Sequence, residues 1–200
     1  MIGIIDYGMG NIFSLQAALN RLNVKNELVF AVDKLDDYKA LMLPGVGAFK
    51  DAMINLEKLG LDKALVEWTT KGKPLLGICL GMQLFFEISR EYGNTKGLGL
   101  IPGTIEKIPA RVKIPHIGWN KLNIENNHPI FKDLNQGYVY FVHSYFAKMP
   151  RDLILAQAPY GVEIPAIVAK NNIVGMQFHP EKSGQTGLKL LENWIQSVNA

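Results

Sequence analysis

The stretch PLLGICLGMQLFF, residues 74–86, predicts a buried strand that turns directly into a helix. Its first half is an apolar run of strand length, and its second half continues as an apolar segment that favours a helix over residues 80–89. Gly77 and Gly81 stand two residues to either side of Cys79, the single cysteine of the chain. A sharp strand-to-helix turn strains its central residue and leaves no room for side chains at the flanking positions. The spacing G-x-C-x-G therefore predicts a nucleophile elbow that presents a cysteine thiol.

Short apolar runs and helical patterns alternate around this elbow. In the first half, strands are expected at 2–6, 40–44 and 74–79, and helices at 11–22, 50–59 and 61–70. In the second half, strands are expected at 104–108, 137–146, 153–158, 165–170 and 172–179, with a hairpin at Asn171 and Asn172 and a closing helix at 186–198. Alternating strands and helices imply parallel pairing. We therefore predict a single α/β domain over residues 1–200, with a mostly parallel sheet, helices on both faces and an antiparallel extension.

The composition excludes several classes of function. The 21 basic and 18 acidic residues leave a charge of +3, and the basic residues are scattered, which is typical of a solvated surface and not of a nucleic-acid site. One cysteine excludes a disulfide framework, and the four dispersed histidines lack metal-ligand spacing. The N-terminus has no signal-peptide pattern, and no apolar run reaches the length of a membrane span. We expect a cytoplasmic protein that needs no metal or cofactor and binds neither nucleic acid nor membrane.

A glycine-rich turn, DYGMGN at residues 6–11, follows the first strand and precedes a helix. The third glycine of a dinucleotide-binding G-x-G-x-x-G motif would fall on Phe13. This turn therefore argues against a Rossmann cofactor site.

A cysteine nucleophile needs a base, and His179 is the best candidate. In MQFHPEKS (176–183) it ends an expected strand, and Glu181 follows two residues later. Residues i and i+2 of an extended segment point to the same face, so Glu181 can hold the imidazole tautomer. The remaining histidines have no carboxylate close in sequence or lie in a polar loop: His116, His143 and His128. The pattern predicts a triad of Cys79, His179 and Glu181.

These two motifs together resemble the class I, triad-type glutamine amidotransferases. Six segments are similar to the glutaminase subunits of imidazole glycerol phosphate synthases: DYGMGN (6–11), LPGVGAF (43–49), PLLGICLGMQLFF (74–86), HIGWN (116–120), YFVHSY (140–145) and QFHPEKS (177–183). The resemblance implies a flavodoxin-like fold and hydrolysis of L-glutamine to glutamate and ammonia. It also implies a heterodimer, in which the ammonia passes through a channel to a cyclase subunit with a (β/α)₈ barrel for histidine biosynthesis.

The resemblance assigns roles to individual residues. Cys79 is the nucleophile, His179 the base and acid, and Glu181 the residue that orients the imidazole. The oxyanion hole comprises backbone groups of Leu80, Val46 and Gly47, and in this family a backbone N–H near Val46 is thought to turn towards the substrate when the partner is loaded. The ends of the glutamine are held by Gln83, Ser144 and Tyr145. The partner contact and ammonia passage involve Asn11, Trp119, Asn120, Tyr140 and Lys182.

Other functions remain open at this point. Relatives with the same triad supply ammonia to other acceptors, including sugar-amidinating enzymes and pyridoxal phosphate synthase, although DYGMGN and HIGWN argue against the latter. A stand-alone cysteine amidohydrolase would work without a partner. A binding subunit without chemistry is the least favoured alternative, because Cys79, His179 and Glu181 are all present.

Overall fold

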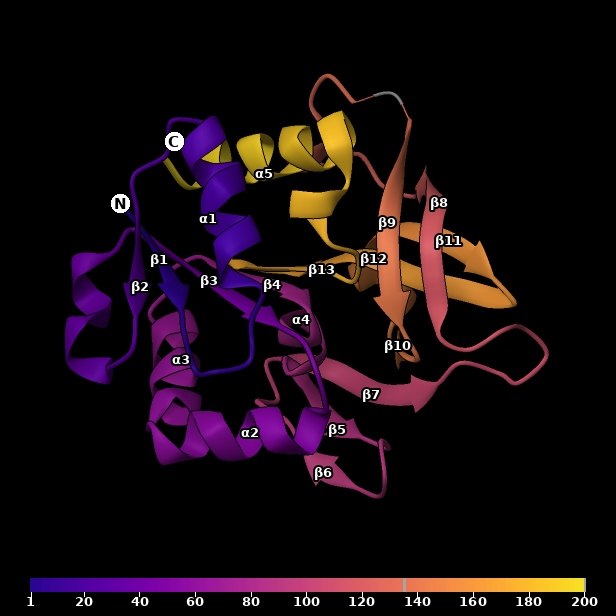
Figure 1. The fold of residues 1–200 in the computed structure, drawn as a ribbon, viewed down its shortest axis with the longest axis horizontal. Helices are drawn as coiled ribbons and strands as arrows, with labels where there is room; N and C mark the ends of the chain where they lie inside the picture. Colours follow the sequence, from indigo (N-terminus) through magenta and orange to yellow (C-terminus); the bar gives the residue numbers. More distant parts are fainter. Residues whose placement is uncertain (135, 200) are drawn as a thin grey trace.

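The computed structural model describes residues 1–134 and 136–199, and a nine-stranded sheet runs through it (Figure 1). The strand order is β2-β1-β3-β4-β13-β12-β11-β8-β9. Five neighbouring strands pair in parallel: β2 (Asn26–Val29), β1 (Ile2–Ile5), β3 (Ala40–Gly45), β4 (Leu75–Cys79) and β13 (Ile173–Met176). Four more continue the sheet in antiparallel fashion: β12 (Val162–Lys170), β11 (Ile154–Tyr160), β8 (His116–Ile124) and β9 (Gly137–His143).

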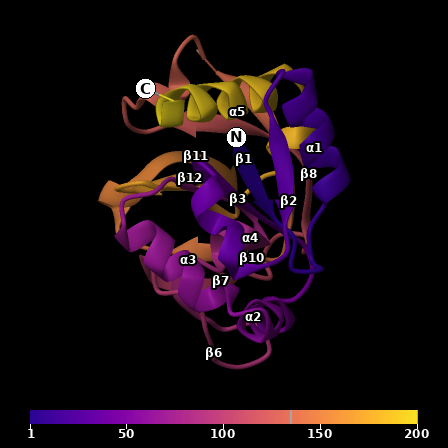
Figure 2. The ribbon, with the colours of Figure 1, turned by 90° about the vertical axis from the view of Figure 1, so that its left-hand side faces the viewer.

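Helices cover both faces of the parallel part. In Figures 1 and 2, α1 (Ile12–Arg21) and α5 (Gly184–Asn199) lie on one side, and α2 (Phe49–Lys58) and α3 (Leu61–Thr70) on the other. Successive strand residues supply two separate cores: Ile4 packs in the core under α1 and α5, whereas Ile5 packs in the core under α2 and α3. This two-sided burial explains why the parallel strands are continuous apolar runs.

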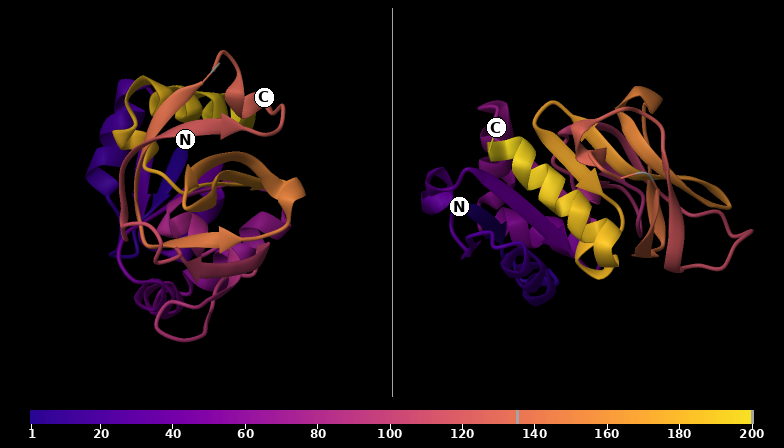
Figure 3. Two further views of the ribbon diagram at one scale, coloured as in Figure 1. Left: turned by 90° about the vertical axis from the view of Figure 1, so that its right-hand side faces the viewer. Right: turned by 90° about the horizontal axis from the view of Figure 1, so that it is seen from above.

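A small second sheet lies beside the main one, with the order β10-β7-β5-β6. Its strands are β10 (Tyr145–Lys148), β7 (Ile101–Lys107), β5 (Phe86–Ser89) and β6 (Thr95–Lys96). Short 3₁₀ turns occur at Val32–Asp37, Pro129–Phe131, Arg151–Leu153 and Pro180–Lys182. The right-hand view of Figure 3 shows α5 lying across the molecule, with the antiparallel strands to one side. None of the helices in the described part of the chain is long and apolar enough to span a membrane.

The predicted α/β architecture and the hairpin at Asn171 and Asn172 are confirmed, because β12 and β13 pair with Lys170 opposite Ile173. The helix predicted over 80–89 is wrong: α4 comprises only Leu80–Gln83, and β5 begins at Phe86. The carbonyl of Phe85 accepts the backbone N–H groups of Leu100 (2.8 Å) and Ile101 (2.9 Å). Pairing with this distant segment therefore overrides the local helical preference.

Three other expectations need correction. The run 137–146 is not one strand, because β9 pairs with β8 and β10 pairs with β7, with Ser144 between them. The strand expected at 172–179 ends at Met176. The strands β2 and β8 were not predicted; β2 lies at the edge of the sheet and is only partly buried, so its sequence lacks a strong apolar run.

Candidate active site

Cys79 lies at the junction of β4 and α4 in a strained backbone conformation, with φ 55° and ψ −111°. Neighbouring atoms, backbone at Gly81 and a ring at Gly77, are close on both sides of the turn. A Cβ atom on Gly81 would lie 1.8 Å from the carbonyl oxygen of Leu43, and one on Gly77 would lie 2.5 Å from the ring of Phe85. Side chains at these two positions cannot fit. The geometry is that of the nucleophile elbow expected from the glycine spacing.

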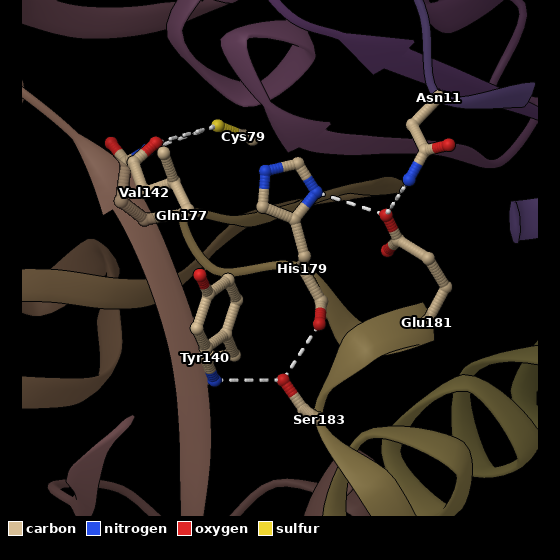
Figure 4. A network of polar contacts seen from close by, with 8 residues as sticks. All are labelled: Asn11, Cys79, Tyr140, Val142, Gln177, His179, Glu181 and Ser183. Carbon is tan, nitrogen blue, oxygen red and sulfur yellow. Dashed lines mark hydrogen bonds and ion pairs between the residues drawn. The ribbon is translucent and has the colours of Figure 1, made fainter. Parts of the chain in front are cut away.

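His179 and Glu181 form a buried pair beside this elbow. Nδ1 of His179 lies 2.9 Å from Oε1 of Glu181, and the side chains are 5% and 2% exposed. Figure 4 shows Cys79 on the opposite side of the imidazole from Glu181. The contact does not arise from an extended segment as expected: Pro180–Lys182 form a 3₁₀ turn, which brings the carboxylate back to the ring.

The surroundings of His179 favour its charged form. Burial by itself would lower the pKa of His179, but its hydrogen bonds to Cys79 and Glu181, together with the charges on both groups, raise that pKa to about 10. Burial and, to a smaller extent, the charge on Cys79 raise the pKa of Tyr7 far above its usual value. The arrangement is therefore suited to a thiolate beside an imidazolium, with Tyr7 kept as a neutral phenol.

Two polar groups approach the sulfur of Cys79. The carbonyl oxygen of Val142 lies 3.7 Å from Sγ, and Nε2 of Gln177 lies 3.9 Å from it. The amide of Gln83 donates to the carbonyl of Tyr145 (3.0 Å) and to Oε1 of Gln177 (3.0 Å). Since a backbone carbonyl can only accept, Gln83 must present its nitrogen here, and Gln177 must present its own nitrogen to the sulfur. Gln177 was missed by sequence reasoning, although it precedes His179 in the QFHPE motif.

The same carbonyl of Tyr145 orients a buried pair of histidines. It accepts from Nδ1 of His143 (2.9 Å), so Nε2 of His143 must accept from Nδ1 of His116 (3.0 Å). Burial lowers the pKa of His116 to about 4 and that of His143 to about 3. Both imidazoles are therefore neutral near pH 7, in contrast to His179.

The pocket in front of Cys79 has a volume of about 470 Å³. It brings together Val46, Gly47, Leu80, Gln83, Ser144 and Tyr145 with Cys79 and His179. Its walls also include one carboxylate, Glu91, and one ammonium group, Lys107, which sequence reasoning missed. Opposite charges that line one small pocket match the ammonium and carboxylate groups of an α-amino acid.

Comparison with known proteins identifies the family. Residues 3–198 match the sequence model of the family "Glutamine amidotransferase class-I". The chain belongs to this family. It is a glutamine amidotransferase, and the enzyme class predicted from its motifs is confirmed.

Close relatives share nearly the full length of the chain. The "imidazole glycerol phosphate synthase subunit HisH" of Oceanobacillus iheyensis is 51% identical, covering 99% of this chain and 100% of the relative. The protein of the same name from a Geobacillus species is 49% identical, covering 99% of this chain and 97% of the relative. Among solved structures, PurLQS from Thermotoga maritima superposes with a TM-score of 0.79 at 20% identity, covering 98% of both chains, and supports the fold.

The oxyanion segment of this amidotransferase holds one expected donor away from the substrate. The backbone N–H of Val46 donates to the carbonyl of Met9 (3.1 Å), while Gly47 adopts a φ of 97°. Leu80 is the first residue of α4, where a backbone N–H has no acceptor within its own helix. All three residues expected at the oxyanion hole, Leu80, Val46 and Gly47, line the pocket; Leu80 stands at a helix start, whereas the N–H of Val46 is already bound to Met9.

One face of the β8–β9 ribbon is exposed and adjoins the pocket at Val142. Three cross-strand pairs form this ribbon face: Ile117 with Val142, Trp119 with Tyr140, and Lys121 with Tyr138. The rings of Trp119 and Tyr140 meet edge to face at 5.9 Å, and Trp119 remains 56% exposed. An aromatic patch of this kind is typical of a protein interface.

The other residues predicted at the partner contact have different surroundings. Lys182 is exposed. The amide of Asn120 donates to the carbonyl of Pro159 (2.8 Å). The amide of Asn11 donates to Oε1 of Glu181 (3.3 Å), so Asn11 belongs to the triad as well as to the surface near it. Within residues 1–134 and 136–199, no group of three or more His, Cys, Asp or Glu side chains could hold a metal ion.

Proposed function

We propose that this amidotransferase is the glutaminase subunit of an imidazole glycerol phosphate synthase. It hydrolyses L-glutamine to glutamate and ammonia and delivers the ammonia to a cyclase subunit for histidine biosynthesis. One observation carries the assignment: the chain aligns over nearly its whole length, at 49% identity, with a relative that bears this subunit name. The geometry around Cys79 supplies the chemistry that a glutaminase requires.

The reaction begins at the sulfur. The Cys79 thiolate attacks the side-chain carbonyl carbon of glutamine, and a tetrahedral oxyanion forms. The imidazolium of His179 then donates its proton to the amide nitrogen, the C–N bond breaks, and ammonia leaves a γ-glutamyl thioester. The neutral imidazole next takes a proton from water, which attacks the thioester, and glutamate departs as the thiolate returns. Glu181 holds Nδ1 of His179 throughout, at the 2.9 Å separation described above.

Completion of the oxyanion hole is the step of the reaction cycle that a partner can control. The N–H of Leu80 provides one donor, whereas that of Val46 is bound to Met9. Turning the peptide at Val46 towards the pocket would add the second donor, and Gly47 permits the required change of dihedral angles. Loss of one oxyanion donor costs about 10²- to 10³-fold in kcat in comparable enzymes. We therefore expect the free chain to be a slow glutaminase.

The pocket can orient the amino-acid end of glutamine. Gln83 uses both of its N–H groups on protein acceptors, so its carbonyl oxygen is left to accept from the substrate ammonium group. Glu91 adds a negative charge for the same group, and Lys107 a positive charge for the substrate carboxylate. Ser144 and Tyr145 line the wall between them.

The ribbon face is the proposed docking site of the cyclase subunit. Val142 both belongs to this face and lines the catalytic pocket, so a partner docked there would cover the pocket mouth. Ammonia released into water becomes ammonium and loses its nucleophilic lone pair. A covered, water-poor passage to the partner, whose expected architecture is a (β/α)₈ barrel, would prevent this loss. The expected cytoplasmic location fits this role.

The deciding experiment measures glutamate release from glutamine. The chain is assayed alone, with the histidine-pathway cyclase subunit, and with that subunit plus its nucleotide ligand; Cys79→Ala is the control in each case. We expect strong stimulation by the loaded partner that is abolished by Cys79→Ala. Lack of stimulation would overturn the assignment of the acceptor, and turnover that survives in Cys79→Ala would overturn the thioester mechanism.

A further inference from the structure

Two hydrogen bonds join strand β9 to the segment that carries His179, and a third, within that segment, closes a ring; Figure 4 shows the two bonds made by the Ser183 hydroxyl. The backbone N–H of His179 donates to the carbonyl of Tyr140 (3.0 Å). The hydroxyl of Ser183 accepts from the N–H of Tyr140 (2.9 Å) and donates to the carbonyl of His179 (2.6 Å). The carbonyl of Tyr140 is thus linked directly to the N–H of His179. The N–H of Tyr140 is linked to the carbonyl of His179 through the Ser183 hydroxyl.

Ser183 is built into this closed ring and is not a replaceable surface residue. It is 1% exposed, and His179 is 4% exposed. Its hydroxyl proton and one lone pair are both used. On its other side, a Cβ atom on Gly187 would lie 2.7 Å from the Cβ of Ser183, so α5 packs directly against it. Removing the hydroxyl would take away the acceptor of the Tyr140 N–H, a loss that folded proteins rarely tolerate, and would leave the His179 carbonyl with only the N–H of Lys182 (3.0 Å).

Strand β9 touches both reacting groups of the enzyme. At Tyr140 its backbone holds His179, and two residues later the carbonyl of Val142 lies 3.7 Å from the Cys79 sulfur. The side chain of Tyr140 meanwhile packs against Trp119 on the exposed ribbon face. A displacement of β9 by a protein docked on that face would reach the histidine through the ring and the cysteine through Val142.

We infer that Ser183 is a positioning residue that locks the His179 backbone to β9 and so transmits docking on the ribbon face to the catalytic imidazole. The identity of the docked protein, the cyclase subunit, rests on the proposed function. The effect of Ser183 on the free chain does not depend on the proposed function. A role in folding alone would change the stability of the chain without changing the pairing of His179 with Cys79.

The test compares Ser183→Ala, which breaks the ring, with Ser183→Thr, which keeps a hydroxyl. In the free chain, the rate of Cys79 alkylation by iodoacetamide is followed against pH, and unfolding midpoints are recorded in parallel. We expect the alkylation profile of Ser183→Ala to move to higher pH, because the imidazolium is no longer held beside the sulfur, and Ser183→Thr to restore it. A lower unfolding midpoint with an unmoved profile would overturn the inference.

The second arm uses the complex with the cyclase subunit and its nucleotide ligand. We expect the partner-stimulated kcat of Ser183→Ala to fall about tenfold, with KM for glutamine and Kd for the cyclase little changed. Full stimulation in Ser183→Ala, or a loss confined to Kd, would overturn the inference. If wild type itself is not stimulated, the proposed function fails, while the alkylation profile still decides the role of Ser183.

A measurement on the wild type covers the case in which Ser183→Ala does not fold. Hydrogen exchange of the backbone amides of Tyr140 and His179 is compared between the free chain and the complex. We expect both amides to be protected in the free chain and to become more protected together on docking. Unchanged exchange of both amides on docking would contradict transmission through this ring.

Discussion

The side chain of Asn11 donates to the same Glu181 oxygen that binds His179, at 3.3 Å, although the two residues are 170 positions apart in the chain. The other carboxylate oxygen of Glu181 is buried with no hydrogen-bond partner among the described residues. Among the residues that the structure describes, Asn11 is therefore the only side chain other than His179 that binds this carboxylate. Its position at the start of α1 links the first turn of the fold to the triad.

We expect Asn11→Ala to lower kcat about tenfold, because a hydrogen bond to a buried carboxylate contributes on the order of 1.5–3 kcal/mol. Glutaminase assays at saturating cyclase subunit measure this loss, and Asn11→Ser is the matched control with a shorter polar side chain. If Asn11→Ala changed only the Kd for the cyclase subunit, Asn11 would be an interface residue and not a support of Glu181.

We expect Gln177→Leu to slow alkylation of Cys79 at pH 7, because it removes the amide donor 3.9 Å from the sulfur. It also removes the acceptor of Gln83, so KM for glutamine should rise. Gln177→Glu keeps an oxygen for Gln83 and places a negative charge near the thiolate, so it should preserve KM better while slowing alkylation further. Equal alkylation rates in all three proteins would contradict the role of Gln177.

Replacing Gly81 should prevent the elbow from forming. The clash of a Cβ atom with the Leu43 carbonyl at 1.8 Å involves backbone on both sides, so Gly81→Ala should lose on the order of 4 kcal/mol of unfolding free energy or fail to fold. The control Gly72→Ala lies at a turn with φ +77° and open space, and should cost only about 1–2 kcal/mol of backbone strain. Urea unfolding compares the two; similar losses would refute the packing argument.

The alkaline limb of the pH profile of glutaminase kcat should depend on Glu181. Cys79 and the Glu181 carboxylate together raise the pKa of His179 to about 10 against the opposing effect of burial, so the imidazolium needed to protonate the departing amide nitrogen persists until the pH approaches that value. Glu181→Gln removes one negative charge, which lowers the pKa of His179 and moves the alkaline limb of kcat to lower pH. A profile that keeps its alkaline limb while kcat falls would assign Glu181 to orientation alone.

The histidine pair should make the fold sensitive to acid. His116 and His143 have folded pKa values of about 4 and about 3, below the unfolded value near 6.5. The unfolded chain therefore binds more protons between these limits, and stability is full above about pH 6.5 and declines as the pH falls towards 4. His116→Asn should reduce the loss of unfolding free energy between pH 7.5 and pH 5, as measured by urea unfolding at pH 7.5, 6 and 5. An identical loss in the variant would exclude the pair as its source.

Much of the active site could be predicted from local patterns. The elbow depends on Gly77 and Gly81, which lie two residues from Cys79, and the contact of His179 with Glu181 also spans two residues. Interactions of this range are governed by short segments, so residue types and spacing are sufficient to indicate them. Local patterns are insufficient where a segment pairs with distant residues: the apolar run after Gln83 has a helical pattern, yet it leaves the helix to pair with residues 100 and 101.

The sequence by itself determined the class of fold, the nucleophile elbow and the His–Glu pair, because each follows from spacing within a few residues. Only the tertiary structure decided which distant groups surround the triad. Asn11 with Glu181, Gln83 with Gln177 and Val142 with Cys79 are separated by 170, 94 and 63 residues. These meetings depend on the order and direction of the strands, and chain periodicity carries no information about which strands become neighbours.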